Sequence, residues 1–256
     1  MVVDRFNLEG KVAIVIGGTG GLGSAICSEL SAAGADLLIG ARDDTRLSKL
    51  ADGIRKEGTR VLTHAIDVTD QNSVKKFVEQ AILKLHRIDV LVNCVGMTIK
   101  KPIVELALAE WQKVIDVNLT GVFLCSQAVV PYMRNAGGGK IVNFCSMGSY
   151  VSIRTSAAYC AAKGGLLQLT KVMAMEWAPW NIQVNAVAPG FFDTPLASGI
   201  KSNAESYNKL MMKSPMKRLG MPDELVSTII YLASSASDFV TGVCIPVDGG
   251  FLVDGI

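Results

Sequence analysis

The sequence predicts an α/β fold in which one domain, residues 1–256, is built on a single doubly wound parallel sheet of about seven strands with helices on both faces. The first observation is that short β-branched runs alternate, along the whole chain, with segments whose apolar residues recur at helical spacing. The second is size, because 256 residues, 50% of them hydrophobic and 19% charged, can bury one large core. The third is that polar residues or glycines close several predicted strands. In a parallel sheet such strand ends meet at one edge, where ligands bind.

The chain opens with a strand, a glycine-rich turn and a helix. KVAIVIGG suits a strand buried on both faces, and SAICSELSAAG resumes at helical spacing. The glycines between them would let backbone N–H groups approach a pyrophosphate at the helix N-terminus, where the helix dipole favours an anion. Two spacings fit, and a purely structural turn is the remaining reading. The spacing G-x-G-x-x-G selects Gly18, Gly20 and Gly23, and the spacing G-x-x-x-G-x-G selects Gly17, Gly21 and Gly23.

The second and third predicted strands end in charged residues. At the end of ADLLIGAR the 2′ position of a dinucleotide would be read, by an acid for NAD or by an arginine for NADP. Arg42 stands there, although a count of about 20 residues from the glycines reaches Asp43 and would favour NAD. RVLTHAIDV, after the helix RLSKLADGIRKEG, predicts a strand ending at Asp67. That carboxylate suits an adenine amine or, equally, a cap for the helix that starts near Asn72.

The middle of the chain predicts a fourth strand followed by a long helix. IDVLVNCVG, after the helix SVKKFVEQAILKLH, ends at Asn93 and Gly96. The segment from Pro102 to Met133 reads as helical and carries Asn118 among apolar neighbours. Because asparagine is unfavourable inside a helix, Asn118 indicates either a buried, satisfied amide or a kink with a function.

The last third of the chain completes the alternation. GGGKIVNFCS and NIQVNAVAPG predict the fifth and sixth strands, and VCIPVDGGFLV predicts the last. Residues 191–215 are mixed and polar enough for a flap over the substrate. MPDELVSTIIYLAS predicts a helix with Pro222 at its first position and Asp223 in its first turn.

The stretch from Ser146 to Lys163 predicts catalysis. If Thr155 or Ser156 caps a helix there, residues four apart lie on one face, and the Lys163 amine lies beside the Tyr159 phenol. A cation within about 4–6 Å favours the phenolate and would bring the tyrosine pKa down from about 10. Alone, Tyr-x-x-x-Lys more often means a partly buried tyrosine near a solvated lysine. The polar strand ends around it favour the catalytic interpretation.

Composition and other motifs exclude several classes. A net charge of +2 with scattered basic residues does not favour nucleic acid or a membrane surface. The six cysteines lack the CxxC spacing of a zinc or redox site, so no metal site is expected and the thiols are predicted to be free in a reducing compartment. No signal-like segment is seen at the N-terminus, so a cytoplasmic protein is expected. A serine hydrolase would need a histidine base, but His64 and His86 fall on a predicted strand and a helix end. No glycine loop ends in G-K-[ST], which excludes a Walker-type kinase.

These motifs, in this order, resemble the short-chain dehydrogenase/reductase family over the whole chain, with its Rossmann-type sheet. The family's glycine motif selects Gly17, Gly21 and Gly23, with Ile16 replacing the usual threonine, and NCVG departs from its N-N-A-G at Cys94 and Val95. The resemblance implies a catalytic tetrad of Asn118, Ser146, Tyr159 and Lys163. It implies a cofactor site formed by Gly17, Thr19, Gly21, Leu22, Gly23, Arg42, Asp67, Val68, Asn93, Gly96, Tyr159, Lys163, Pro189, Gly190 and Thr194.

The resemblance also implies a chemistry and a cofactor. Tyr159 would pass a proton to or from the substrate oxygen while a hydride moves between nicotinamide and carbon, Ser146 would hold that oxygen, Lys163 would hold the ribose, and Asn118 would anchor a water. NAD-using members place their acid where Ala41 stands, so NADP(H) is expected in preference to NAD(H). Gly20 occupies a position that is basic in other NADP users, so only one of two cationic contacts is expected.

The substrate is expected to be a small carbonyl compound or alcohol. The segment after the fourth strand is similar to reductases of sugar acids and polyols, and 3-oxoacyl-carrier-protein reductases are the alternative. Met97, Met147, Phe191 and Phe192 are expected to form an apolar wall of the cleft. The apolar C-terminal segment predicts a homotetramer of dihedral type. The rival from another class is a regulator that binds NADP without reacting.

Overall fold

The computed structural model describes residues 3–54, 58–195, 201–202 and 204–253. In these residues seven strands form one parallel sheet in the order β3-β2-β1-β4-β5-β6-β7. The strands are β1 (Val12–Ile16), β2 (Asp36–Ala41), β3 (Val61–Ala65), β4 (Val90–Asn93), β5 (Gly139–Phe144), β6 (Ile182–Pro189) and β7 (Cys244–Val247). The predicted fold class is confirmed, and the strand order reverses direction between β1 and β4.

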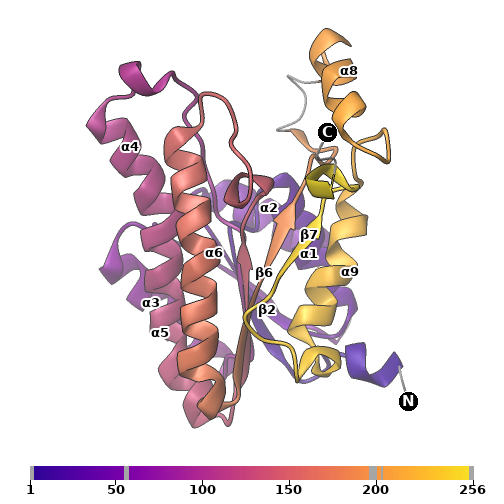
Figure 1. Cartoon of the computed structure of the whole chain (residues 1–256). Coiled ribbons are helices and arrows are strands. Elements are labelled where there is room, and N and C mark those ends of the chain that lie inside the picture. The colour runs from indigo at the N-terminus through magenta and orange to yellow at the C-terminus, as the bar shows by residue number, and fades with distance from the viewer. Residues whose placement is uncertain (1–2, 55–57, 196–200, 203, 254–256) are drawn as a thin grey trace.

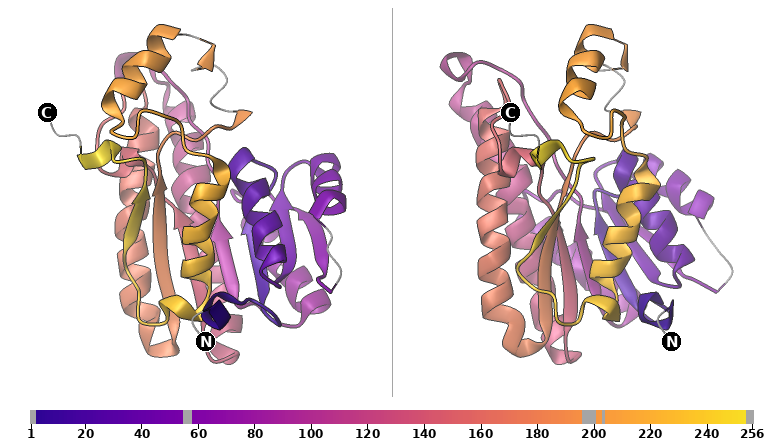
Figure 2. Two further views of the ribbon diagram at one scale, coloured as in Figure 1. Left: turned by 90° about the vertical axis from the view of Figure 1, so that its right-hand side faces the viewer. Right: turned by 45° about the vertical axis from the view of Figure 1, so that its right-hand side comes forward.

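Helices cover both faces of this sheet (Figures 1 and 2). One face carries α1 (Gly21–Ala32), α2 (Asp44–Ile54) and α9 (Pro222–Ala233), and the other carries α3 (Gln71–Leu85), α4 (Leu108–Ile115), α5 (Gly121–Asn135) and α6 (Ala157–Trp177). The helix α8 (Ala204–Lys213) lies beyond the carboxyl end of β6, at the top of Figure 1. Each face has its own apolar cluster, since successive strand side chains point to opposite faces.

The central strands are buried throughout, as the β-branched runs predict. All five residues of β1 and all four of β4 are buried. Ile14 packs with Phe77 of α3 on one face, whereas Val15 packs with Leu30 of α1 on the other. Burying one such aliphatic side chain contributes about 1.5–3 kcal/mol, so the sheet is the rigid base on which its carboxyl edge is built.

The helix predicted from Pro102 to Met133 is shorter and less regular than expected. The turn Ile103–Glu105 is 3-10, and the α-helix begins at Leu108, where Glu110 accepts a hydrogen bond from the backbone N–H of Ala107 at 3.1 Å. Between α4 and α5 the segment Asp116–Thr120 forms a π-helical turn that contains Asn118. Such a turn inserts one residue into the helix, and π turns are frequent at functional sites.

Across α4 and α5, the helix Leu108–Asn135 is long and apolar enough to cross a membrane by length and composition, the only such helix among the described residues. Its most apolar window has a mean hydropathy of 1.5, and 44% of that window is buried in this fold. Val122, Cys125 and Val129 are among the buried residues, packed under the sheet or against α6. The apolar composition therefore serves the core of this domain.

Two predicted element ends differ from the structure. The strand β3 ends at Ala65, two residues before Asp67, because Asp67 folds into a turn and accepts hydrogen bonds from the N–H and hydroxyl of Thr69 at 2.9 and 2.7 Å. The cap of α3 is Asp70, which accepts from Asn72 N at 2.9 Å, so the capping role considered for Asp67 is wrong.

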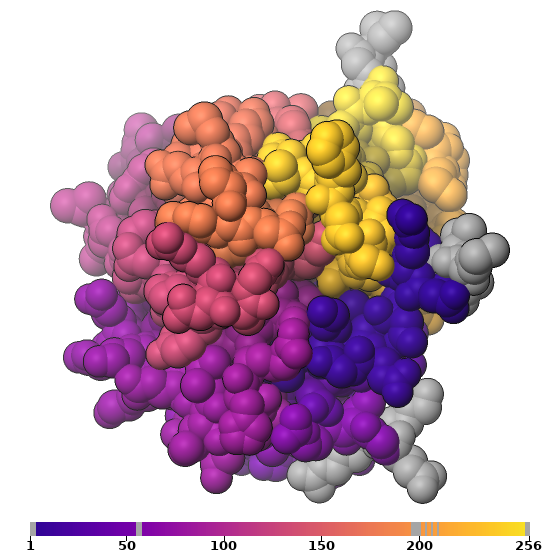
Figure 3. All heavy atoms as spheres, turned by 90° about the horizontal axis from the view of Figure 1, so that it is seen from below, coloured from indigo at the N-terminus to yellow at the C-terminus, as the bar shows by residue number. Residues whose placement is uncertain are grey.

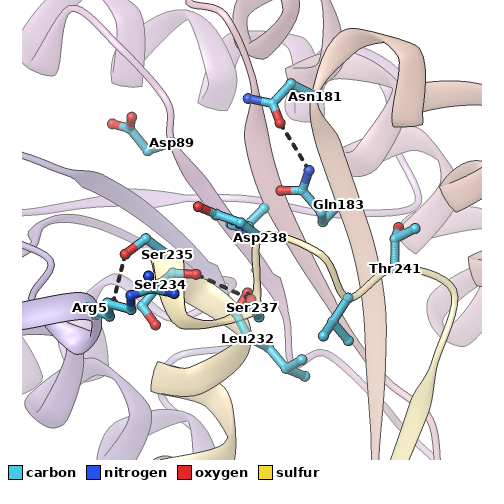
Figure 4. A network of polar contacts seen from close by, with 12 residues as sticks. Arg5, Asp89, Asn181, Gln183, Leu232, Ser234, Ser235, Ser237, Asp238 and Thr241 are labelled. Carbon is cyan, nitrogen blue, oxygen red and sulfur yellow. Dashed lines mark hydrogen bonds and ion pairs between the residues drawn. The ribbon is translucent and has the colours of Figure 1, made fainter. Parts of the chain in front are cut away.

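At the amino-terminal edge of the sheet, the first described residues pack against the segment that follows α9. Seen from below, the N-terminal residues lie beside the C-terminal part of the chain (Figure 3). The Ser235 hydroxyl donates to the carbonyl of Arg5 at 3.0 Å, and the Ser237 hydroxyl contacts the carbonyls of Leu232 and Ser234 (Figure 4). These contacts hold the loop between α9 and β7 and leave the opposite edge for the site.

The predicted flap, 191–215, is described only in part, since 196–200 and 203 lie outside the described residues. Its first residues form a bridge between Phe192 and Gly220, and its end is α8. The helix α9 begins with Pro222 at its first position and Asp223 in its first turn, as predicted.

Candidate active site

The glycine turn after β1 is built on Gly17 and Gly23. Gly17 has φ +88°, and a Cβ there would lie 2.8 Å from the backbone N of Val95, after β4. A Cβ on Gly23 would lie 2.3 Å from the carbonyl oxygen of Gly17, whereas one on Gly20 would meet the same oxygen at an ordinary 3.5 Å. Gly21 is also required, because its Cβ would meet Thr194 at 2.8 Å. Gly18 of the other spacing is crowded too, since a Cβ there would lie 2.3 Å from Ile39 Cγ2. The spacings therefore differ at Gly17 and Gly21, which have no room for a Cβ, and at Gly20, which has room, and this difference favours the G-x-x-x-G-x-G spacing.

A cleft of about 360 Å³ opens beside this turn, between the carboxyl ends of β1 and β4 where the strand order reverses. Ligands bind at such switch points in open α/β sheets. Of the predicted cofactor residues, those that line the cleft are Gly17, Thr19, Arg42, Asp67, Val68 and Gly96. Hydrogen bonds from Thr69 lower the pKa of Asp67, with the charge of Arg42 as a lesser cause, so this carboxyl is ionised near neutral pH.

Two predicted cofactor residues point away from the cleft. The Asn93 side chain is fully buried and donates to Ser126 Oγ at 3.1 Å and Asn143 Oδ1 at 2.9 Å, which turns it into the core. Leu22 packs against the apolar cluster under α1. Asn93 and Leu22 are close in sequence to residues that line the cleft, but their side chains point away from it.

The tyrosine and serine of the predicted tetrad meet. Ser146 follows β5, is 7% exposed, and its hydroxyl oxygen accepts from Gly148 N at 3.1 Å. The Ser146 side chain lies near enough to the Tyr159 phenol to act on the pKa of the phenol, which it lowers. Ser156 occupies the N-cap position of α6, but its side chain makes no capping hydrogen bond, and Thr155 has φ +61° outside the helix. The predicted capping contact is therefore wrong, while the predicted helix forms.

Burial is the largest cause of the pKa shifts of Tyr159 and Lys163. It raises the pKa of Tyr159, with Ser146 acting in the opposite direction, so the predicted lowering of this pKa by a neighbouring ammonium is wrong. The Lys163 Nζ lies 5.8 Å from the centre of the Tyr159 ring and donates to the carbonyl of Phe144 at 2.6 Å. Lys163 is 2% exposed, and burial lowers its pKa to about 8. The amine thus titrates close to working pH.

Asn118 joins the lysine to the cleft. Its Nδ2 donates to the carbonyls of Met97 and Val114, both at 2.8 Å, and its Oδ1 accepts from Met97 N at 3.3 Å. A Cβ placed on Gly96 would lie 3.1 Å from Asn118 Oδ1 and 3.7 Å from Lys163 Nζ, so both side chains face this glycine of the cleft wall. Asn118 is therefore at once a satisfied buried amide and part of a helix irregularity, the two alternatives that its sequence position allows.

The remaining predicted residues lie where β6 and β7 end. Pro189 ends β6, and Gly190 donates its N–H to the carbonyl of Val247 at 2.9 Å. Thr194 lies over Gly21 of the glycine turn. The chain after β6 therefore returns to the N-terminus of α1, where a dinucleotide's phosphates would bind.

The residues expected to form an apolar wall of the substrate cleft do not all line one cavity. Met97 lines the cleft, but Met147 and Phe192 are 4% and 6% exposed and pack inside the domain. Phe191 and Phe192 instead line a separate cavity of about 220 Å³ beside α8. The donors and acceptors around the cleft fit a dinucleotide: a glycine turn without room for Cβ atoms, a carboxylate at Asp67 and a guanidinium at Arg42.

The sequence reasoning missed several cleft residues. The most informative is Arg46, a second guanidinium on the first turns of α2, together with the apolar residues Ile66, Val95 and Val117. A basic residue within one helical turn of Arg42 was the available signal. His64 in β3 and His86 at the end of α3 lie where predicted, and among the described residues no group of three His, Cys, Asp or Glu side chains could hold a metal ion.

Comparison with known proteins agrees with this geometry. Residues 17–252 match the protein family described as enoyl-(acyl carrier protein) reductase. The chain is 36% identical over 254 residues to 2-dehydro-3-deoxy-D-gluconate 5-dehydrogenase of Formosa agariphila, covering 98% of this chain and 96% of the relative. It is 37% identical over 247 residues to a 3-oxoacyl-(acyl-carrier-protein) reductase of Thermotoga maritima, covering 96% and 100%.

A solved structure matches this fold over the whole chain. The gluconate 5-dehydrogenase of Burkholderia cenocepacia, crystallised with NADP and tartrate, superposes with a TM-score of 0.94 at 36% identity and 99% coverage of each chain. Full-length coverage at this identity, the shared sheet and the matching motifs lead to one assignment. The chain belongs to the short-chain dehydrogenase/reductase family.

Proposed function

We propose that the protein is an NADP(H)-dependent oxidoreductase that interconverts a ketone and a secondary alcohol on a small sugar acid of the gluconate type. The observation that carries the proposal is that Ser146 lies near Tyr159, and Lys163 near Asn118, at the carboxyl edge of the sheet beside the cleft. Family membership and the NADP found in the Burkholderia relative support the cofactor.

Tyr159 and Ser146 act on the substrate oxygen. Bound in the cleft, NADP(H) would supply or accept the hydride at the substrate carbon. Tyr159 donates its phenolic proton to the oxygen during reduction and takes it back during oxidation. Because Gly148 N fills one acceptor position of Ser146, the serine hydroxyl is oriented to donate and can stabilise negative charge on the same oxygen.

Lys163 and Asn118 support the tyrosine. The buried Lys163 amine, held by the Phe144 carbonyl, faces Gly96 and is placed to bind the ribose of a dinucleotide in the cleft. When the amine is charged it favours the phenolate and so eases proton transfer. Asn118 fixes Met97 and the cleft wall, and its Oδ1 faces the amine, where it can hold a water between lysine and solvent.

The substrate class follows from relatives. Two of them, from Formosa and Burkholderia, are named for gluconate-type substrates, whereas the Thermotoga relative is named for 3-oxoacyl-carrier-protein reduction. We therefore expect D-gluconate with NADP⁺ to be turned over with a higher kcat/KM than a 3-oxoacyl thioester with NADPH. A reversed order would support the acyl reductase. Absence of turnover with both, together with tight NADP binding, would support the non-catalytic regulator.

The exposed surface and the thiols bear on the oligomeric state of the protein and on its compartment. Several large apolar side chains of α5 and α6 are exposed in the single chain: Phe123, Tyr132, Val172 and Met175. An apolar surface of this kind is typical of a face covered by another copy. We propose a homotetramer in the cytoplasm, where six free thiols would remain reduced.

A further inference from the structure

The lining of the cleft carries two arginines, whereas the sequence predicted one. Its lining includes two basic side chains, Arg42 directly after β2 and Arg46 on α2. They flank the strand end where the 2′ position of a dinucleotide is read, since Ala41, the last residue of β2, lines the same cleft. Gly20, which could have carried a second cation from the glycine turn, also lies in this wall.

We propose that Arg46 is a second 2′-phosphate ligand that acts with Arg42 and determines the preference for NADP(H) over NAD(H). The inference rests on the proposed function, because it assigns a residue to the cofactor site of that same reaction. Two guanidiniums can share the oxygens of one phosphate, and each can donate two hydrogen bonds in a fixed fork.

Arg46 is positioned for this role by its neighbour Asp43. One carboxylate oxygen of Asp43 accepts from the backbone N–H of Arg46 at 3.0 Å, which caps α2 and orients its first turn toward the cleft. Asp43 is therefore the cap of α2. The helix N-terminus also adds partial positive charge on the side of the phosphate.

The ion pair between Arg46 and Asp43 leaves the Arg46 guanidinium free to bind another anion. Arg46 Nε lies 3.5 Å from Asp43 Oδ2, and the side chains are 74% and 52% exposed. Exposed pairs of this kind contribute about 0–1 kcal/mol, so a phosphate with up to two negative charges can replace the carboxylate as the partner. Since the cap uses the backbone of Arg46, the guanidinium can turn to the phosphate without unwinding α2.

Neighbouring acids set the expected size of the effect. Asp43 and Asp44 are exposed, and Asp67 lines the same cleft with its carboxylate accepting from Thr69. These charges oppose a phosphate, but solvent screens the exposed ones. A single arginine among them leaves a small net attraction, whereas two arginines give the cleft mouth a clear preference for the phosphorylated cofactor.

The test measures binding, not turnover. Dissociation constants of NADP⁺ and NAD⁺ are determined by isothermal titration calorimetry on the full chain for the wild type and for Arg42→Ala, Arg46→Ala, Arg46→Lys and Lys49→Ala. Lys49 is the matched control, because it is an exposed cation of α2 that does not line the cleft among the described residues. Its removal changes the net charge by the same amount.

We expect Arg46→Ala to weaken NADP⁺ binding by about 10-fold, as for loss of one charge-assisted contact, with NAD⁺ changed by less than about 2-fold. Arg46→Lys should fall between, since lysine keeps the charge and loses the fork. If Arg42→Ala weakens NADP⁺ selectively while Arg46→Ala behaves like Lys49→Ala, the inference is overturned and the proposed cofactor stands. If the wild type binds NAD⁺ more tightly, the proposed NADP preference itself fails. If the wild type prefers NADP⁺ but Arg42→Ala leaves that preference unchanged, the inference that the two arginines act together is overturned.

Discussion

At the residue scale, acidity in this site is set by burial more than by the spacing of charges. The i, i+4 spacing predicts that Lys163 lies beside Tyr159, and the two side chains do lie on one face of α6. Burial nevertheless raises the pKa of the phenol and lowers that of the amine to about 8. The sequence identifies the groups, and their depth in the fold decides their protonation.

Tyr159→Phe should reduce kcat by roughly 10²-fold or more, because the positioned proton donor is lost. NADP⁺ affinity should change little, since the ring and its packing remain. Steady-state kinetics measures kcat, and calorimetry measures NADP⁺ affinity. A variant that keeps wild-type turnover would refute the role proposed for the phenol.

The buried amine of Lys163 predicts a pH-dependent stability. Its pKa is about 8 in the fold and 10.5 as the ordinary value, so between these pH values the unfolded chain holds the proton that the folded chain has released. Stability therefore rises with pH across this window by at most about 1.4 kcal/mol per unit, and the cost of burying the charge is fully present below about pH 8.

Lys163→Met removes that titration. Urea unfolding of the cofactor-free protein at pH 7.5 and 9.5 should show the wild type gaining stability relative to the variant at the higher pH. Subtracting the variant cancels the titration of other groups common to both proteins. An unchanged difference between the two pH values would mean that the amine is not desolvated as the structure indicates.

At the element scale, the glycine turn and the irregular helix show what spacing can and cannot predict. The strand, turn and helix are evident from the sequence, but two glycine spacings fit it equally well. The close approaches to Gly17 and Gly21, and the ordinary contact at Gly20, distinguish them. Likewise, the helical periodicity around Asn118 does not reveal a π turn, which depends on hydrogen bonds to Met97 in another segment.

Gly23→Ala and Gly20→Ala form a matched pair that tests the turn. An alanine Cβ at Gly23 would approach the Gly17 carbonyl oxygen to 2.3 Å, whereas at Gly20 it would lie 3.5 Å away, in ordinary contact. We expect Gly23→Ala to lose at least about 10-fold in dinucleotide affinity, since the N–H groups that bind the phosphates move. Gly20→Ala should bind nearly as the wild type, and equal losses would favour the other spacing.

A buried polar chain links the four elements that carry the site. Asn93 of β4 contacts Ser126 of α5 and Asn143 of β5, and Asn143 Nδ2 donates to Thr170 Oγ1 of α6 at 3.0 Å. Each of these elements also carries or borders a tetrad member or a cleft residue. The chain therefore fixes the relative register of strands and helices on which the site depends.

Thr170→Val should lower the free energy of unfolding by about 1–3 kcal/mol, because it leaves the buried Asn143 amide without an acceptor. Thr170→Ser keeps the hydroxyl and should cost less. Denaturant unfolding of the two variants gives the comparison. Thr170→Val keeps the methyl group and loses only the hydroxyl, whereas Thr170→Ser loses only the methyl group. If Thr170→Val cost no more than Thr170→Ser, the hydrogen bond to Asn143 would not be the source of the stability.

At the scale of the whole molecule, the exposed apolar side chains of α5 and α6 predict association. We expect multi-angle light scattering to return about four times the 27.2 kDa of one chain. Met175→Glu, at a side chain 71% exposed in the single chain, should reduce the mass without unfolding the domain, because a charge would be buried in the interface. Glu176→Gln, also exposed on α6, is the control. A wild-type mass near one chain would refute the tetramer.

The sequence by itself determined the α/β class, the strand order along the chain, the first turn of α9 and the identity of the residues that gather at the carboxyl edge. It could do so because β-branched runs, helical periodicity and glycine spacing are local properties. The depth of Lys163, the turning of Asn93 into the core, the π turn at Asn118 and the presence of Arg46 in the cleft were decided only by the tertiary structure. Each of these depends on contacts between segments far apart in the chain, and neither periodicity nor spacing encodes such contacts.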